Sequence, residues 1–149
     1  MGESFDDRFR GDYCLTGDAR RLSIDVIHDW LAHEAYWARG RSIADVATSI
    51  AHSHLYGVVS RGGDLVACAR MITDEVTFGW VCDVFVAAEH RAQGIGTWMV
   101  DEIVAHWTNV GVRRVLLATR DAHEVYAKVG FAPLAHPERM MEVDHRPGF

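Results

Sequence analysis

The spacing of apolar residues changes along the chain, and it predicts two helices followed by a group of strands. From Ser23 to Glu34 the apolar residues fall on one face of a helix. A second helix is expected from Ser42, because Ser42-x-x-Asp45 resembles a capping box with Asp in place of the usual Glu. Between residues 54 and 86 the apolar runs are rich in β-branched and aromatic residues, which favours strands.

Three strands, at residues 54–60, 65–73 and 76–86, are expected to form an antiparallel meander. The Arg-Gly-Gly-Asp sequence at residues 61–64 is typical of a hairpin turn, and Gly79 is a candidate bulge in the third strand. Before the first helix, residues 1–11 are polar and expected to be loose, and residues 12–16 are expected to form a short first strand.

The pattern after residue 86 predicts a strand–helix–strand unit. Apolar residues repeat every four positions from Ile95 to Trp107 in a helix expected at about 93–109, and Gly111 suits a left-handed helix end. The apolar run 115–118 is typical of a strand buried on both faces, parallel to the strand that ends at Val86. The last expected elements are a short helix at 122–128 and two final strands, at Phe131 and at 139–143.

Composition narrows the class of protein. The 149 residues suffice for one domain, spanning residues 1–149, with a hydrophobic core. The formal net charge of −6 argues against nucleic acid as a main partner. No signal peptide and no transmembrane run is present, so no membrane partner and a cytoplasmic location are expected. Three widely spaced cysteines favour small buried side chains over disulfides or zinc.

The glycines of Arg91-x-x-Gly94-x-Gly96 follow a predicted buried strand and open a predicted helix. The first-turn amides of a helix have no partner within it, and the helix dipole adds positive charge there. Glycines keep side chains away, so a diphosphate can touch these amides. A P-loop would need a lysine after its glycines, and a dinucleotide fingerprint would need glycine at position 99, which is Met99. An anion site and an ordinary strand-to-helix turn both remain open on this stretch alone.

A second stretch, Ala122-x-x-x-Tyr126-x-Lys128-x-Gly130-Phe131, changes the interpretation. With both motifs in this order, behind two helices and a meander, the chain resembles the GCN5-related N-acetyltransferases. The resemblance covers most of the chain. It implies an α+β fold with a central mixed, mostly antiparallel, twisted sheet of about six to seven strands, with helices on both faces. In that fold the two parallel strands splay apart and form a notch for the cofactor.

The resemblance implies acetyl-coenzyme A as co-substrate, with its pyrophosphate on the helix amides and its pantetheine arm paired to the preceding strand. The residues implied to hold it are Val84, Phe85, Val86, Arg91, Gln93, Gly94, Ile95, Gly96, Thr97 and Thr119. Thr119 stands where the family usually has Asn, and a hydroxyl cannot supply both amide groups. Tyr126 is implied to be the general acid, because a phenol has a pKa near that of a thiol. A core tyrosine is the alternative.

The general base is open. Asp83 lies beside the cofactor strand and could have a pKa raised by burial, or it could form an ion pair with an arginine. His28, His123 and Glu124 are further candidates, and the family often uses only a water chain. The nine histidines show no metal-ligand spacing, so no metal is expected.

The acceptor is expected to be a small-molecule primary amine. Trp37, Arg39 and Arg41 lie in an aromatic and basic loop. This loop either binds the acceptor, including a carboxylate or phosphate that the acceptor carries, or it is held to the core by Trp37 with both arginines in solvent. A protein or peptide acceptor, a non-catalytic acyl-coenzyme A sensor and a homodimer are alternatives that the sequence leaves open.

Overall fold

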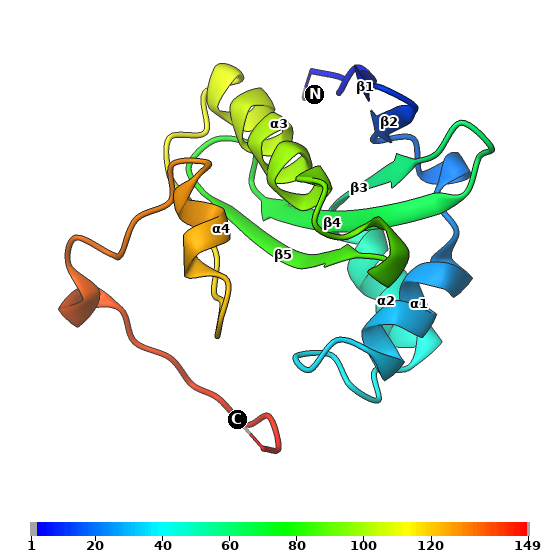
Figure 1. Ribbon diagram of the computed structural model, residues 1–149. Coiled ribbons are helices and arrows are strands. Elements are labelled where there is room, and N and C mark those ends of the chain that lie inside the picture. The colour runs from blue at the N-terminus through cyan, green and yellow to red at the C-terminus, as the bar shows by residue number, and fades with distance from the viewer. Residues whose placement is uncertain (1–2, 149) are drawn as a thin grey trace.

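The computed structural model describes residues 3–148, and its centre is a six-stranded sheet whose strands lie in chain order (Figure 1). Neighbours are antiparallel from β1 to β5, and β5 and β6 are parallel, as the sequence predicts. The strands are β1 (Arg8–Arg10), β2 (Tyr13–Thr16), β3 (His54–Val59), β4 (Leu65–Thr73), β5 (Gly79–Val86) and β6 (Val115–Leu116). Residues 1, 2 and 149, which include part of the stretch predicted to be loose, lie outside the described residues.

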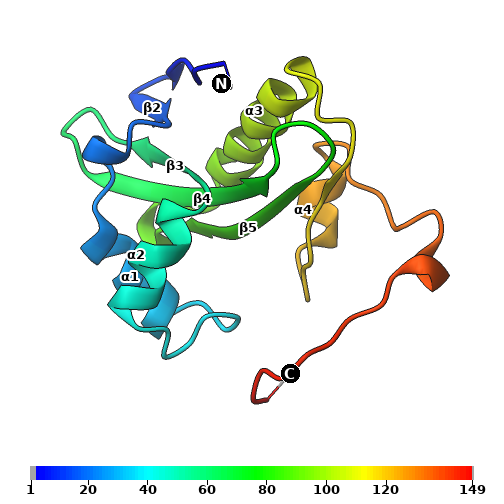
Figure 2. The same ribbon diagram turned by 180° about the vertical axis from the view of Figure 1, so that it is seen from behind.

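Helices cover both faces of this sheet (Figures 1 and 2). α1 (Ile24–His33) and α2 (Ile43–Ala51) lie on one face, and both begin where the sequence predicts. The side chain of Ser23 accepts a 3.3 Å hydrogen bond from the Val26 N–H, and Ser42 accepts one of 3.1 Å from the Asp45 N–H. None of the helices within residues 3–148 is both long and apolar enough to cross a bilayer.

The other face is covered by α3 (Ile95–Asn109), the crossover helix between β5 and β6 (Figure 1). The predicted stripe from Ile95 to Trp107 is buried, and each such side chain contributes about 1.5–3 kcal/mol on leaving water. The Trp107 indole donates a 3.0 Å hydrogen bond to the Tyr56 hydroxyl, which fixes the far end of α3 on the sheet. Gly111 adopts φ +110° beyond the helix, in the left-handed region expected for it.

The bulge in β5 lies at Asp83, not at Gly79. Cys68 of β4 faces Phe85 and Arg70 faces Cys82, so β5 carries one extra residue between these pairs. Asp83 has φ +50°, an uncommon conformation for a residue with a side chain. Gly79 instead begins the strand. β5 begins three residues later than predicted, because Asp74 accepts hydrogen bonds from backbone N–H groups that follow it and closes a turn.

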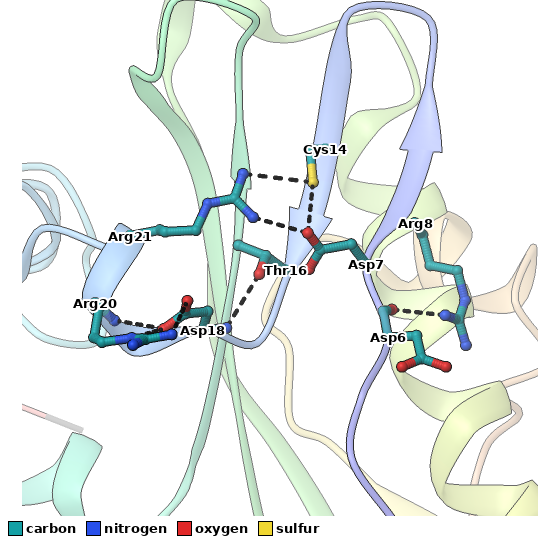
Figure 3. Close-up of polar contacts among 8 residues, drawn as sticks. All are labelled: Asp6, Asp7, Arg8, Cys14, Thr16, Asp18, Arg20 and Arg21. Atoms are coloured by element: carbon teal, nitrogen blue, oxygen red, sulfur yellow. Dashed lines mark hydrogen bonds and ion pairs between the residues drawn. The ribbon is translucent and has the colours of Figure 1, made fainter.

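The polar N-terminal stretch contains β1, a strand that the sequence pattern did not predict. Figure 3 shows the contacts that hold it. Arg21, in the short 3-10 helix η1 (Ala19–Arg21), donates a 2.8 Å hydrogen bond to Asp7 and a 3.7 Å one to the Cys14 sulfur. The Cys14 thiol donates to Asp7 at 3.5 Å. These contacts tie the residue before β1 to the strand beside it.

The two final strands predicted at Phe131 and 139–143 are not formed. After α4 (His123–Ala127) the only regular element within the described residues is the 3-10 helix η3 (Pro137–Arg139). Every residue from 132 to 148 is exposed, and residues 142–146 of this segment border a cavity together with Trp80 of β5 and Ala118. An alternating pattern alone does not make a strand, because a strand also needs a hydrogen-bonding neighbour.

Candidate active site

The sheet opens between β5 and the chain that follows β6. These strands pair only at Gly79–Val115 and Trp80–Leu116, and β5 then continues alone on that side to Val86. A cavity of about 380 Å³, called the notch below, lies in this opening. Its lining includes Tyr36, Trp37, Arg41, Arg70, Ile72, Trp80, Asp83, Val84, Thr119, Asp121, Tyr126 and Arg146. Residues 80–84 of β5 thus border the notch, and beyond Trp80 the strand has no partner on that side.

The start of α3 carries exposed hydrogen-bond donors. Gly94 begins the helix with φ +75° and offers no side chain to cap it. Within residues 3–148, the amides of Ile95, Gly96 and Thr97 have no acceptor. A Cβ on Gly96 would lie 3.3 Å from a Val86 methyl group, so glycine lets the helix start lie close to the end of β5. This geometry suits a bound anion such as a phosphate.

Two arginines lie next to these amides, and the sequence analysis identified only one of them. Arg91 donates a 2.8 Å hydrogen bond to the Val86 carbonyl, and its guanidinium lies 5.2 Å from the centre of the Phe85 ring. Arg10 of β1 lies so close to Gly94 that a Cβ there would be 3.3 Å from its terminal nitrogens. Arg10 was missed because its segment was predicted to be loose. The alternating pattern of polar and apolar residues around Arg10 covers too few positions to indicate a strand.

The other residues predicted to hold the cofactor divide between exposed and buried positions. Gln93 is exposed, and its amide oxygen accepts a 3.4 Å hydrogen bond from the Tyr13 hydroxyl. Val84 and Val86 are half-buried, whereas Phe85 is buried and stacks on Trp30 with 5.2 Å between ring centres. The Phe85 side chain therefore holds α1 to the sheet.

Tyr126 of α4 reaches the notch from the side opposite β5. Its ring meets Phe131 edge to face at 6.0 Å, and within residues 3–148 its hydroxyl makes no hydrogen bond. Burial, with smaller contributions from Tyr36 and Asp121, raises the pKa of the Tyr126 phenol. The hydroxyl therefore stays protonated at neutral pH, as a proton donor must.

Asp83 lies in an ion pair, which is one of the two roles that the sequence leaves open for it. Its carboxylate accepts hydrogen bonds from Arg70 at 2.9 Å, Arg41 at 2.8 Å and the Trp37 indole at 2.9 Å. Burial by itself raises the pKa of Asp83, but the charges and hydrogen bonds of these partners outweigh it and the pKa is lowered. A carboxylate held charged in this way is a poor base, so these contacts favour the ion-pair role of Asp83 over the role of catalytic base.

Thr119 lines the notch but also closes a local turn. Its hydroxyl oxygen accepts a 3.0 Å hydrogen bond from the Ala122 N–H at the start of α4. The sequence analysis expected a departure here, and the structure shows what the hydroxyl does. Its proton remains the one group that Thr119 can offer to a ligand.

The loop at residues 36–41, called the acceptor loop below, closes the notch opposite the helix start. The Tyr36 hydroxyl accepts a 3.2 Å hydrogen bond from the Arg120 N–H, and the Arg120 guanidinium lies 3.7 Å from the centre of the Tyr36 ring. A wider cavity of about 1030 Å³ continues from the notch and is bordered by Arg39, Arg41, Arg120 and Arg146. Tyr36, Arg70 and Arg120 are site residues that the sequence analysis did not single out.

The further base candidates lie elsewhere. His28 is hydrogen-bonded at 3.0 Å to the Arg41 carbonyl, and His123 and Glu124 line a different cavity beside α4. Within residues 3–148, no group of three or more histidine, cysteine or acidic side chains is placed to hold a metal ion.

Comparison with known proteins agrees with the fold and the two motifs. The sequence profile of the Acetyltransferase (GNAT) family matches residues 24–131. A candidate acetyltransferase from Gibberella zeae is 30% identical over 140 residues, covering 80% of this chain and 78% of that one. The crystal structure of a candidate GNAT acetyltransferase from Xanthomonas campestris superposes with a TM-score of 0.83 at 39% identity, covering 89% of this chain and 92% of that one.

A more distant structure shows the same fold. N-acetylglutamate synthase from Neisseria gonorrhoeae, solved with coenzyme A and N-acetyl-glutamate, superposes with a TM-score of 0.69 at 17% identity, over 87% of this chain and 30% of that one. The profile match covers more than half of the chain and includes the helix start, the notch and Tyr126. The chain therefore belongs to the Acetyltransferase (GNAT) family.

Proposed function

We propose that this protein transfers the acetyl group of acetyl-coenzyme A to a primary amine of a small molecule. The observation that carries the proposal is that β5 has no strand partner on one side beyond Trp80 and connects two features. The donor amides at residues 95–97 lie at its end, where Gly96 approaches Val86, and the Tyr126 hydroxyl, which makes no hydrogen bond within residues 3–148, lines the notch together with Val84. Family membership supports the reaction class.

The helix start is suited to the pyrophosphate of the coenzyme. The amides of residues 93–97 donate to it, and Arg91 and Arg10 supply positive charge on either side of Gly94. On the side away from β4, residues 84–86 have no strand partner, and apart from the Val86 carbonyl, which accepts from Arg91, the backbone groups on that side can pair with the amide groups of the pantetheine arm. When bound, acetyl-coenzyme A supplies the activated acyl group.

Tyr126 acts as the general acid. The amine nitrogen attacks the thioester carbonyl carbon, the carbon–sulfur bond breaks, and the thiolate takes the phenol proton of Tyr126. A phenol is protonated at neutral pH even at its ordinary pKa near 10, and burial raises the pKa of Tyr126 further, so the hydroxyl still holds its proton when the thiolate forms. The reacting amine must also lose a proton, and water is its acceptor, because the Asp83 carboxylate is already held by Arg70 and Arg41.

The charges around the notch help the amine to bind in its neutral form. Arg41, Arg70 and Asp83 together carry one net positive charge, and Arg70 and Asp83 are buried. Nearby positive charge disfavours an ammonium ion and so lowers the pKa of a bound amine. The same charge favours an anionic group elsewhere on the acceptor. The arginines that border the wider cavity are placed to bind a carboxylate or phosphate there.

An amine panel tests this proposal. Release of free coenzyme A thiol is measured with amines that carry a carboxylate or phosphate and with neutral amines of matched size. We expect turnover that is fastest with the anionic amines, and a loss of at least tenfold in kcat for Tyr126→Phe with unchanged coenzyme A affinity. Tyr56→Phe is the matched control, because Tyr56 also loses a hydroxyl but lies under α3, away from the notch.

Two results would contradict the proposal in different ways. Coenzyme A binding without turnover of any amine would favour a non-catalytic acyl-coenzyme A sensor. If Tyr126→Phe turns over as fast as the wild type, Tyr126 is not the general acid. That result would leave the proposed coenzyme A site unchanged.

A further inference from the structure

A separate cavity, of about 560 Å³, lies at the opposite end of α3 from Gly94 and is called the far cavity below. Its walls come from the segment before β1, the turn between β2 and η1, the beginning of β3 and the last turn of α3. Within residues 3–148 it shares no lining residue with the notch or with the wider cavity beside the notch. A ligand of the far cavity would therefore be bound apart from the proposed acetyl transfer.

His106, in the last turn of α3, is the first feature that points to a ligand. It lines the far cavity and is only 9% exposed, and in the described part of the chain its ring nitrogens make no hydrogen bond. Both nitrogens keep some accessible surface, because no fully buried side-chain nitrogen or oxygen of the described residues lacks a partner. Buried polar side chains are normally hydrogen-bonded, so this ring is ready to pair with a group that enters the cavity.

The His106 imidazole is neutral at neutral pH. Burial, and next the charge of Arg8, lower the pKa of this ring. A neutral imidazole has one donor and one acceptor nitrogen. His106 can therefore accept a hydrogen bond from an N–H group of a ligand.

Carboxylates give the lining an excess of negative charge. Two of the four are paired with arginines, as Figure 3 shows for Arg20 and Arg21. Glu3 and Glu75 also line the cavity, and neither contacts an arginine or lysine among the residues that the structure describes. Glu75 is hydrogen-bonded instead to His54 Nε2, at 2.9 Å. The negative end of the α3 dipole adds to this charge, so the far cavity favours a cation.

Aromatic rings form another part of the wall. The centre of the Phe5 ring lies 4.9 Å from that of Tyr56 and 5.2 Å from that of His106, and all three residues line the cavity. The Trp107 ring, which also lines it, meets His54 with 4.6 Å between centres. Aromatic faces attract cations and also pack against carbon chains. Negative charge, aromatic rings and an acceptor nitrogen together suit an organic cation.

We propose that the far cavity binds a small organic cation, an amine in its ammonium form. The ammonium group donates a hydrogen bond to His106 and is neutralised by Glu3 and Glu75, and the carbon chain packs on the aromatic rings. The notch has the opposite character, because its net positive charge disfavours an ammonium ion. The proposal is independent of the proposed acetyl transfer, and its tests measure binding alone.

Calorimetry with two chains of equal length tests the charge of the ligand. The probes are 1,4-diaminobutane, which is a cation at neutral pH, and 1,4-butanediol, which is neutral. We expect the diamine to bind at least tenfold more tightly than the diol, with an affinity that falls as salt is added. Equal affinities for the two probes, or no binding of the diamine, would overturn the proposal.

A variant that fills the far cavity tests where the diamine binds. Gly17 lines the cavity, and a Cβ there would lie at ordinary contact distances, 3.5 Å from Tyr56 and 3.6 Å from Phe5. Gly17→Leu should therefore fold, which unchanged coenzyme A binding would show, and weaken diamine binding at least tenfold. Gly62→Leu is the matched control, because Gly62 lies in the turn between β3 and β4 and a Cβ there would meet only Ser60 Oγ, at 3.9 Å. Wild-type diamine affinity in Gly17→Leu would place the diamine elsewhere and overturn the proposal.

Two further variants test the contacts of the ammonium group. His106→Phe keeps an aromatic ring and removes both nitrogens, so diamine binding should weaken at least tenfold. Glu75→Gln removes one carboxylate charge and should weaken it about fivefold. Asp29→Asn is the control, because Asp29 is an exposed carboxylate of α1 that does not line the cavity. Diamine affinity at the wild-type level in both His106→Phe and Glu75→Gln would contradict the proposal.

Discussion

The Arg41 guanidinium donates a 2.8 Å hydrogen bond to the Asp83 carboxylate, and this contact joins the acceptor loop to the bulge of β5. Arg70 contacts the same carboxylate oxygen from β4, at 2.9 Å. The bulge shifts the register of β5 against β4 by one residue just before residues 84–86. It also places the Asp83 carboxylate, a buried anion, where two arginines hold it.

Asp83→Asn tests whether Asp83 is structural. Removing its charge leaves Arg70 buried without a counter-ion, so we expect the free energy of unfolding to fall by about 3–5 kcal/mol in urea titrations. The pH at which kcat/KM rises should not move, because Asp83 does not take the proton of the amine. Asp29→Asn removes an exposed carboxylate and serves as the control. Loss of the acidic limb of the pH profile in Asp83→Asn would restore Asp83 as a base.

Gly94→Ala tests the anion site at the start of α3. Gly94 has φ +75°, and a Cβ there would meet the Arg10 guanidinium, so we expect both a stability loss of about 1–2 kcal/mol and weaker coenzyme A binding by calorimetry. Gly111→Ala is the control, since Gly111 has φ +110° with no atom within 4 Å of its Cβ position. Gly111→Ala should lower the free energy of unfolding and leave the coenzyme A affinity unchanged. Equal coenzyme A affinity in the two variants would place the diphosphate elsewhere.

Arg10→Ala tests the cation that the sequence analysis missed. We expect coenzyme A to bind about fivefold more weakly, roughly 1 kcal/mol, with a smaller dependence of the affinity on salt. Arg20→Ala removes an exposed arginine that pairs with Asp18, away from α3, and should bind as the wild type does. Dephospho-coenzyme A lacks the phosphate on the ribose and keeps the pyrophosphate. If Arg10 contacts the pyrophosphate, Arg10→Ala should therefore weaken the binding of this analogue as well.

The pH dependence of stability tests the contacts that order the N-terminal stretch. Hydrogen bonding, first from Thr16 and then from Arg21 and Cys14, lowers the pKa of Asp7. Because the pKa of Asp7 is lower in the folded state, its contacts stabilise the fold fully above the ordinary carboxylate pKa, near 3.8. This contribution to stability is lost as the pH falls through the lowered pKa. The melting temperatures of the wild type and Asp7→Asn should therefore differ at pH 7 and converge in acid. A constant difference would exclude this role.

The sequence predicted the elements whose pattern is set by their own residues. The start of the first helix at Ser23, the cap at Ser42, the meander and the buried stripe of α3 depend on local chemistry or on one long face, and each was found where predicted. The strand–helix–strand unit was found as well, with β5 and β6 parallel and α3 between them.

What the sequence could not predict depends on contacts between distant segments. Arg10 lies beside Gly94 because β1 pairs with β2, and three residues carry too short a pattern to indicate a strand. Asp83 could be a base or an ion-pair partner until Arg70 and Arg41 were placed beside it. The strand predicted at residues 139–143 is not formed, because a strand also needs a hydrogen-bonding neighbour.

A crystal structure with coenzyme A tests the central claim most directly. The account predicts the pyrophosphate on the amides of residues 95–97, the pantetheine arm along residues 84–86, and the thiol within hydrogen-bonding distance of the Tyr126 hydroxyl. A pyrophosphate bound away from the start of α3, or a thiol separated from Tyr126 by protein, would contradict it.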